Sequence, residues 1–165
     1  MDQLFVIREI DYITIGRVFL AFVLGGLVGF ERERTQRPAG LRTHMLVAAG
    51  AACFTVASIY GFQGMGVNSD PARLAAQIIT GIGFLGAGAI FRTGDTVKGI
   101  TTASSIWITA SIGILIGAGM VYLAIFTTVM TWFVFYVVKS IEMRLEHKRP
   151  DGRNGGQDTD TSAKR

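Results

Sequence analysis

Charged residues occur in a few short segments of this sequence and leave long uncharged stretches between them. The chain has 165 residues, half of them hydrophobic, with 16 basic and 12 acidic residues. A helix needs about 20 mostly apolar residues to cross a bilayer, and several uncharged stretches approach that length. We therefore predict one domain, an all-α membrane protein with transmembrane helices at about 14–31, 43–62, 72–91, 100–118 and 120–138.

The distribution of Lys and Arg predicts the orientation, because basic residues in short loops favour the cytoplasmic side. The connections after the first and third predicted helices, together with the C-terminal segment, carry 13 of the 16 basic residues. We expect the N-terminus outside and the C-terminus in the cytoplasm. The basic residues then serve topology and contact with anionic lipid, not nucleic-acid binding. Outside the membrane we expect an extracytoplasmic head at 1–13, a cytoplasmic helix extension at 139–149 and a disordered tail at 150–165.

Three glycines have the G-x-G-x-x-G spacing of nucleotide-binding loops: Gly81, Gly83 and Gly86. A genuine loop of this kind follows a strand and opens a helix, whereas these glycines lie inside an apolar run. In lipid, small residues let helices approach closely, so we interpret the glycines as packing surfaces. At 100° per residue Gly81 and Gly88 lie opposite Gly83 and Gly86, which predicts that the third helix lies between two neighbours.

Polar and small residues on other helices indicate further contacts. Gln77 shares the Gly81 and Gly88 face and is expected to hydrogen-bond to protein. Thr102, Ser105, Thr109 and Gly113 form a stripe that we expect to face the third helix, although such a stripe also suits a narrow ion path. Gly25 and Gly29 form a G-x-x-x-G packing pair. The aromatic fifth helix, which has no glycine, should lie at the lipid-facing periphery.

Two charged residues lie at the predicted outer boundary. Asp70 precedes Pro71 and is expected to cap the third helix, with a hard divalent cation as the alternative ligand of its carboxylate. Arg17 lies inside the first helix, where it either snorkels to the surface or pairs with Asp70. The lone Cys53 allows no intramolecular disulfide and no cysteine-based metal site. No nucleophile and base arrangement supports catalysis, so we expect no enzyme activity and no cofactor.

Charged residues on the predicted inner side have two readings. They either anchor the topology or form a cytoplasmic docking surface together with Arg92, Asp95 and Lys98. The candidates at the ends of the first two helices are Glu31, Arg32, Glu33, Arg34, Arg42, Thr43 and His44.

Three segments together resemble the MgtC/SapB family of bacterial inner-membrane proteins: ERERTQRPAGLRTHMLVAAGAA, DPARLAAQIITGIGFLGAGAIF and VKGITTASSIWITASIG. The resemblance covers about residues 17 to 111. Many members carry a folded cytoplasmic domain after the membrane part, and we expect this chain to correspond to the membrane part alone. The family motifs map onto Arg17, Glu31, Arg32, Glu33, Gly40, Leu41, Arg42, His44, Asp70, Pro71, Arg73, Gln77, Gly81, Gly83, Gly86, Gly88, Gly99, Thr101, Thr102 and Trp107.

The resemblance implies a function in adaptation to low magnesium and, in pathogens, in survival inside macrophages. It also implies a non-enzymatic regulator that contacts other membrane proteins such as the ATP synthase. A magnesium or other cation transporter is the alternative, and binding of Mg²⁺ itself is left open. The small-residue faces also suit a homo-oligomer.

Overall fold

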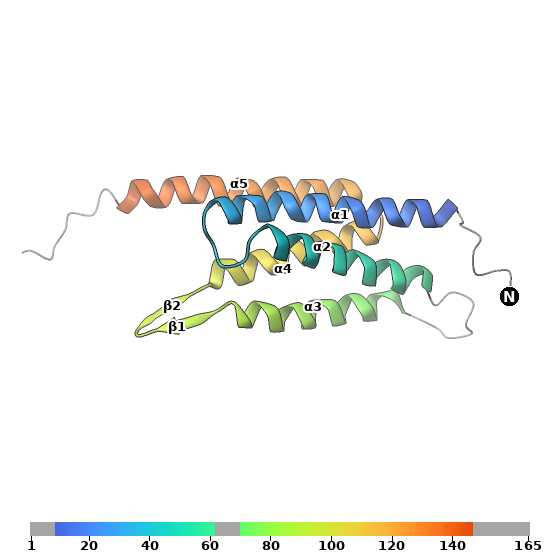
Figure 1. Ribbon diagram of the computed structural model, residues 1–165, viewed down its shortest axis with the longest axis horizontal. Coiled ribbons are helices and arrows are strands. Elements are labelled where there is room, and N and C mark those ends of the chain that lie inside the picture. The colour runs from blue at the N-terminus through green and yellow to red at the C-terminus, as the bar shows by residue number, and fades with distance from the viewer. Residues whose placement is uncertain (1–8, 62–69, 147–165) are drawn as a thin grey trace, which may run out of the picture. The chain divides into compact units, whose positions relative to one another are not determined.

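Each predicted apolar stretch forms a helix in the computed structural model, which describes residues 9–61 and 70–146. A π-helical turn, η2 (Ala57–Gly61), extends the second helix, and a hairpin of β1 (Phe91–Thr93) and β2 (Thr96–Lys98) joins the third helix to the fourth. The helices, shown in Figure 1, are α1 (Glu9–Arg34), α2 (Leu41–Val56), α3 (Pro71–Gly88), α4 (Ile100–Gly117) and α5 (Val121–Glu146).

The mostly helical fold with five helices is confirmed. Among the described residues three helical segments are long and apolar enough to cross a membrane, namely Asp11–Arg34, Leu41–Gly61 and Ile100–Gly117. The apolar parts of α3 and α5, Ala72–Gly88 and Val121–Val137, are shorter. The whole predicted tail, residues 1–8 of the predicted head and residues 147–149 of the predicted helix extension lie outside the described residues.

Helix α2 packs between α1 and α4, and glycines on the two outer helices make this possible. A Cβ atom at Gly25 of α1 would lie 2.6 Å from the Ala48 Cβ, and one at Gly117 of α4 would lie 2.7 Å from the Thr55 Cβ. A Cβ at Gly29 would lie 2.8 Å from the backbone of Leu41. The predicted packing role of Gly25 and Gly29 is therefore confirmed.

Among the described residues helix α3 has neighbours along one side, whereas the sequence predicted a neighbour on each of its two glycine faces. It packs on α4, α2 and η2 along one side, where a Cβ at Gly86 would lie 3.6 Å from the Ala103 Cβ. A Cβ at Gly81, Gly83 or Gly88 would meet nothing within 4 Å. Gly86 thus faces α4 with room for a Cβ in ordinary van der Waals contact, and the other three glycines contact no neighbouring helix of the described chain.

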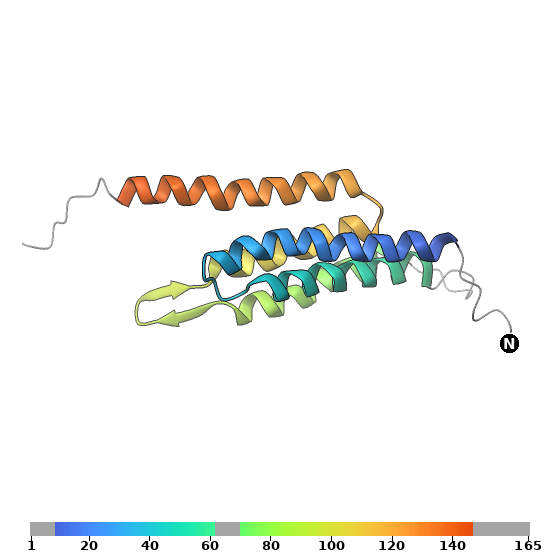
Figure 2. The same cartoon turned by 45° about the horizontal axis from the view of Figure 1, so that its top comes forward.

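The hairpin between α3 and α4 is a second difference, because residues 89–91 were expected to continue the helix. Strand residues Phe91, Arg92 and Thr93 pair with Lys98, Val97 and Thr96 in antiparallel register. Gly94 and Asp95 form a two-residue turn, and Gly94 has a φ of 60°, which glycine adopts without a steric penalty. Figure 2 shows the hairpin extending beyond the ends of α3 and α4.

The chain divides into two compact units, Met1–Phe133 and Val134–Arg165. The first contains α1 to α4, the hairpin and the first half of α5. In that half, Tyr122, Phe126 and Trp132 are exposed, which agrees with the lipid-facing position predicted for the fifth helix.

Candidate functional site

A cluster of buried polar groups, here called the buried polar cluster, lies where the end of α1 meets the first turns of α2 and α4. Its members are Arg32, Gly40, His44, Thr102 and Ser105. Arg32, His44, Thr102 and Ser105 are each at most 3 % exposed. Charged and polar groups at such positions are stable only with hydrogen-bond partners.

Arg32 connects α1 to α4. Its Nη2 donates a hydrogen bond to Thr102 Oγ1 over 2.8 Å. Its sequence neighbour Glu31 is half-buried and interacts with it electrostatically. Among the described residues the Glu31 Oε2 atom is buried without a hydrogen-bond partner. A guanidinium and a carboxylate therefore lie near each other at the end of a helix that is long and apolar enough to cross a membrane.

His44 connects the start of α2 to α4. Its Nδ1 lies 2.8 Å from the carbonyl oxygen of Gly40, and its Nε2 lies 3.1 Å from Ser105 Oγ. Ser105 Oγ in turn lies 2.7 Å from the carbonyl oxygen of Thr102, so the two halves of the cluster meet on α4. Thr109, one turn further along α4, uses its hydroxyl to donate to the Ser105 carbonyl over 2.7 Å.

Glu33 fixes the connection beneath this cluster. Its Oε2 accepts a hydrogen bond from Leu41 N over 2.9 Å, at the start of α2. A carboxylate at this position also complements the positive end of the helix dipole. A Cβ at Gly40 would collide with the carboxylate of the exposed Glu33 side chain, so a larger residue there would displace that carboxylate from Leu41 N.

A smaller polar group lies at the opposite ends of the same three helices. Arg17 donates to Tyr60 Oη over 3.1 Å and to the carbonyl oxygen of Gly117 over 3.0 Å. The Arg17 guanidinium carbon also lies 5.9 Å from the centroid of the Tyr60 ring. The structure thus gives Arg17 partners on η2 and α4 in place of the expected Asp70.

The remaining predicted residues lie apart from both groups. Asp70 caps α3, since its Oδ1 accepts from Ala72 N over 2.9 Å. Among residues 9–61 and 70–146 no three His, Cys, Asp or Glu side chains are grouped as a metal site requires. Arg42, Arg73 and Gln77 are exposed.

The stripe on α4 was predicted correctly, but its neighbour was not. Thr102, Ser105 and Thr109 are buried, and the first two bond to α1 and α2 instead of α3. Sequence reasoning also missed Tyr60 and Gly117. The spacing of Gly113 and Gly117 is a G-x-x-x-G signal that could have identified the second of these.

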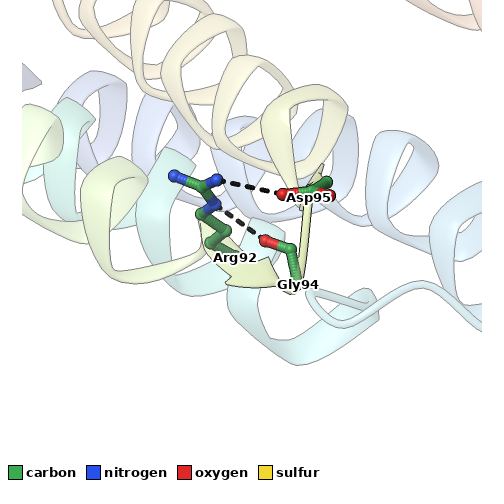
Figure 3. Close-up of polar contacts among 3 residues, drawn as sticks. All are labelled: Arg92, Gly94 and Asp95. Carbon is green, nitrogen blue, oxygen red and sulfur yellow. Dashed lines mark hydrogen bonds and ion pairs between the residues drawn. The ribbon is translucent and has the colours of Figure 1, made fainter.

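The hairpin holds the charged residues expected on a docking surface. Figure 3 shows Arg92 donating to the Gly94 carbonyl over 2.8 Å and pairing with Asp95 over 3.5 Å. Both side chains are exposed, so this ion pair adds little stability.

Comparison with known proteins places these features in a family. The profile of the MgtC family matches residues 18–144. "Putative magnesium transporter YhiD" of Escherichia coli K12 is 44 % identical over 136 residues, which is 80 % of this chain and 63 % of that protein. "Protein MgtC" of Brucella suis is 48 % identical over 126 residues, 76 % of this chain and 51 % of that protein.

An uncharacterized protein of Haemophilus influenzae is 44 % identical over 124 residues, 72 % of this chain and 52 % of that protein. The chain therefore spans between half and two thirds of the length of these relatives. No solved structure matches it. The family profile covers well over half of the chain, including every member of the buried polar cluster, and the chain belongs to the MgtC family.

Proposed function

We propose that this chain is a non-enzymatic regulator in the membrane that acts in magnesium homeostasis by contacting other membrane proteins through α3. The observation that carries the proposal is the outer face of α3, defined as Gln77, Gly81, Phe84 and Gly88. At 100° per residue these four side chains lie within about 60° of one another, opposite Gly86, which packs on α4.

This face has the composition of a helix contact in lipid. A Cβ at Gly81 or Gly88 would meet nothing within 4 Å, and Phe84 is 81 % exposed. Small residues allow another helix to approach, and an exposed Gln77 amide in hydrocarbon gains a hydrogen bond from a protein partner. The relatives named MgtC and YhiD connect the family to magnesium. The ATP synthase, implied by the family resemblance, is the first partner to examine.

The test is growth of a strain without this protein in limiting magnesium. We expect wild type to restore growth and Gly81→Leu or Gly88→Leu to fail while reaching the same level in the membrane. The bulky side chain would keep a partner helix away without disturbing the fold. Gly16→Leu is the matched control, because Gly16 of α1 also has nothing within 4 Å of its Cβ position. Full rescue by both α3 variants would contradict the proposal.

A cation transporter is the second candidate, favoured by the name of the YhiD relative, "Putative magnesium transporter". The buried polar cluster offers weak support for a cation path, because the positive charge of Arg32 within it repels Mg²⁺. Proteoliposomes loaded with a magnesium indicator distinguish the candidates. Magnesium flux that is lost in Asp70→Ala or Gln77→Ala would replace the regulatory proposal with transport.

A further inference from the structure

Two acceptors near His44 compete for one hydrogen. The hydrogen is that of the Ser105 hydroxyl, and the acceptors are His44 Nε2 and the Thr102 carbonyl oxygen. A carbonyl oxygen only accepts, so the 2.8 Å contact with Gly40 places a hydrogen on His44 Nδ1. The 3.1 Å contact between Nε2 and Ser105 Oγ then depends on the protonation of the ring. Neutral His44 has only a lone pair at Nε2, whereas protonated His44 has an N–H there.

Ser105 has a single hydroxyl hydrogen and two acceptors within reach. One is His44 Nε2, and the other is the Thr102 carbonyl oxygen at 2.7 Å. With neutral His44, Ser105 donates to Nε2 and gives up the bond to Thr102. With protonated His44, Nε2–H donates to Ser105 Oγ, and the Ser105 hydroxyl is released to donate to Thr102. Both states satisfy both ring nitrogens.

We infer that His44 is a proton-binding site and that the Ser105 hydroxyl responds to the bound proton. When the proton binds, this hydroxyl turns from His44 Nε2 to the Thr102 carbonyl oxygen. The ligand is a proton, and no heavy atom has to move for the bonds to exchange. The Oγ1 atom of the same Thr102 accepts the hydrogen bond from Arg32. The exchange of bonds at the Thr102 carbonyl therefore involves the residue that joins α4 to α1.

The charged groups at this end of the bundle lie on α1, on its connection to α2, at the start of α2 and on the hairpin. Arg32 is the charged group of α1 that faces His44, and a bound proton places a second positive charge beside it. Helix α4 carries no charged residue, and α3 carries only Arg73, in its first turn at the other end of the bundle. The other charged residues at this end are Glu31, Glu33, Arg34, Arg37 and Arg42, together with Arg92, Asp95 and Lys98 of the hairpin.

The experiment is nuclear magnetic resonance on the full chain in lipid nanodiscs with ¹⁵N-labelled histidine and a ¹³C-labelled Thr102 carbonyl. His147→Gln removes the only other histidine of the sequence. At alkaline pH we expect the Nδ1–H tautomer, which is the minor form of free histidine in water. On acidification we expect both ring nitrogens to become protonated and the Thr102 carbonyl signal to shift over the same pH range.

Ser105→Ala separates the proposed exchange from a general pH effect. In this variant the His44 ring should still titrate, but the Thr102 carbonyl signal should no longer follow it. Ser104→Ala is the matched control, because the exposed Ser104 hydroxyl donates to Ile100 on the same helix and should leave the coupling intact. An Nε2–H tautomer at alkaline pH, or a Thr102 signal that ignores the titration in the otherwise wild-type chain, would overturn the inference.

Discussion

At the scale of single residues, Arg32 is the most demanding side chain, because the residue is charged and only 3 % exposed, at the end of an apolar helix. A buried charge is costly unless it is hydrogen-bonded and balanced by an opposite charge. Thr102 supplies a hydrogen bond and Glu31 supplies the opposite charge. The members of the cluster therefore depend on one another. Removal of one member leaves the others without a hydrogen-bond partner or a counter-charge.

Arg32→Met tests this dependence. The substitution keeps an apolar stem but leaves the half-buried Glu31 carboxylate without its counter-charge. We expect a loss of about 3 kcal/mol, seen as a fall of about 10 °C in the apparent unfolding temperature in detergent. Arg34→Met, an exposed arginine two residues further along α1, should change the temperature by less than about 2 °C. Equal effects of the two substitutions would contradict the structural role of Arg32.

Arg17→Met tests the polar group at the other end of the helices. The variant loses the hydrogen bonds to Tyr60 and to the Gly117 carbonyl, and the contact with the Tyr60 ring. We expect a cost of about 1 to 2 kcal/mol, again measured as the unfolding temperature. Tyr60→Phe keeps the ring contact and should cost less. The exposed Arg73 provides the control, Arg73→Met, and a larger effect there would restore the idea of a pairing role near Asp70.

At the scale of elements, glycines distinguish helix faces that touch protein from faces that do not. A Cβ at Gly113 would collide with the backbone of Ala48, whereas one at Gly83 would meet open space. Gly113→Ala should therefore destabilise the bundle by about 2 kcal/mol or more through overpacking. Gly83→Ala should be neutral or slightly stabilising, because alanine is the better helix former. Circular dichroism melting of both variants in detergent checks this, and a larger loss for Gly83→Ala would refute it.

The elements themselves could be predicted from the sequence, but their neighbours could not. Uncharged stretches between charged segments gave five helices with ends near the observed ones. The stripe from Thr102 to Thr109 was also recognisable, because small and polar residues in lipid mark a helix contact. The helix that this stripe faces could not be predicted from the sequence. Lipid is as apolar as a protein core, so no polar outer face reveals how the helix is oriented.

Two further differences have local causes. The hairpin was missed because FRTGDTVK follows an apolar helix directly, although Gly94 and Asp95 have the two-residue turn pattern of a β-hairpin. The partner of Arg17 was missed because Asp70 was chosen as an opposite charge at the same predicted boundary, whereas the observed partners are the uncharged Tyr60 hydroxyl of η2 and a backbone carbonyl of α4.

At the scale of the whole molecule, the charges of the first unit differ between its two ends. The basic residues at the end with the buried polar cluster and the hairpin are Arg32, Arg34, Arg37, Arg42, Arg92 and Lys98. The basic residues among the described part of the other end are Arg17 and Arg73. Basic residues in short connections favour the cytoplasm. We therefore expect the cluster near the cytoplasmic face and the Arg17 group near the outer face.

Single cysteines at the two ends of α4 test this orientation. In a Cys53→Ser background, Asp95→Cys places a thiol on the exposed hairpin, and Met120→Cys places one in the exposed connection to α5. Helix α4 has 18 residues between them, about 27 Å, close to the hydrocarbon thickness, so the two thiols should lie on opposite sides. A membrane-impermeant maleimide should label Met120→Cys in right-side-out vesicles and Asp95→Cys only in inverted ones. The opposite pattern would reverse the topology, and labelling of both from one side would show that α4 does not cross the bilayer.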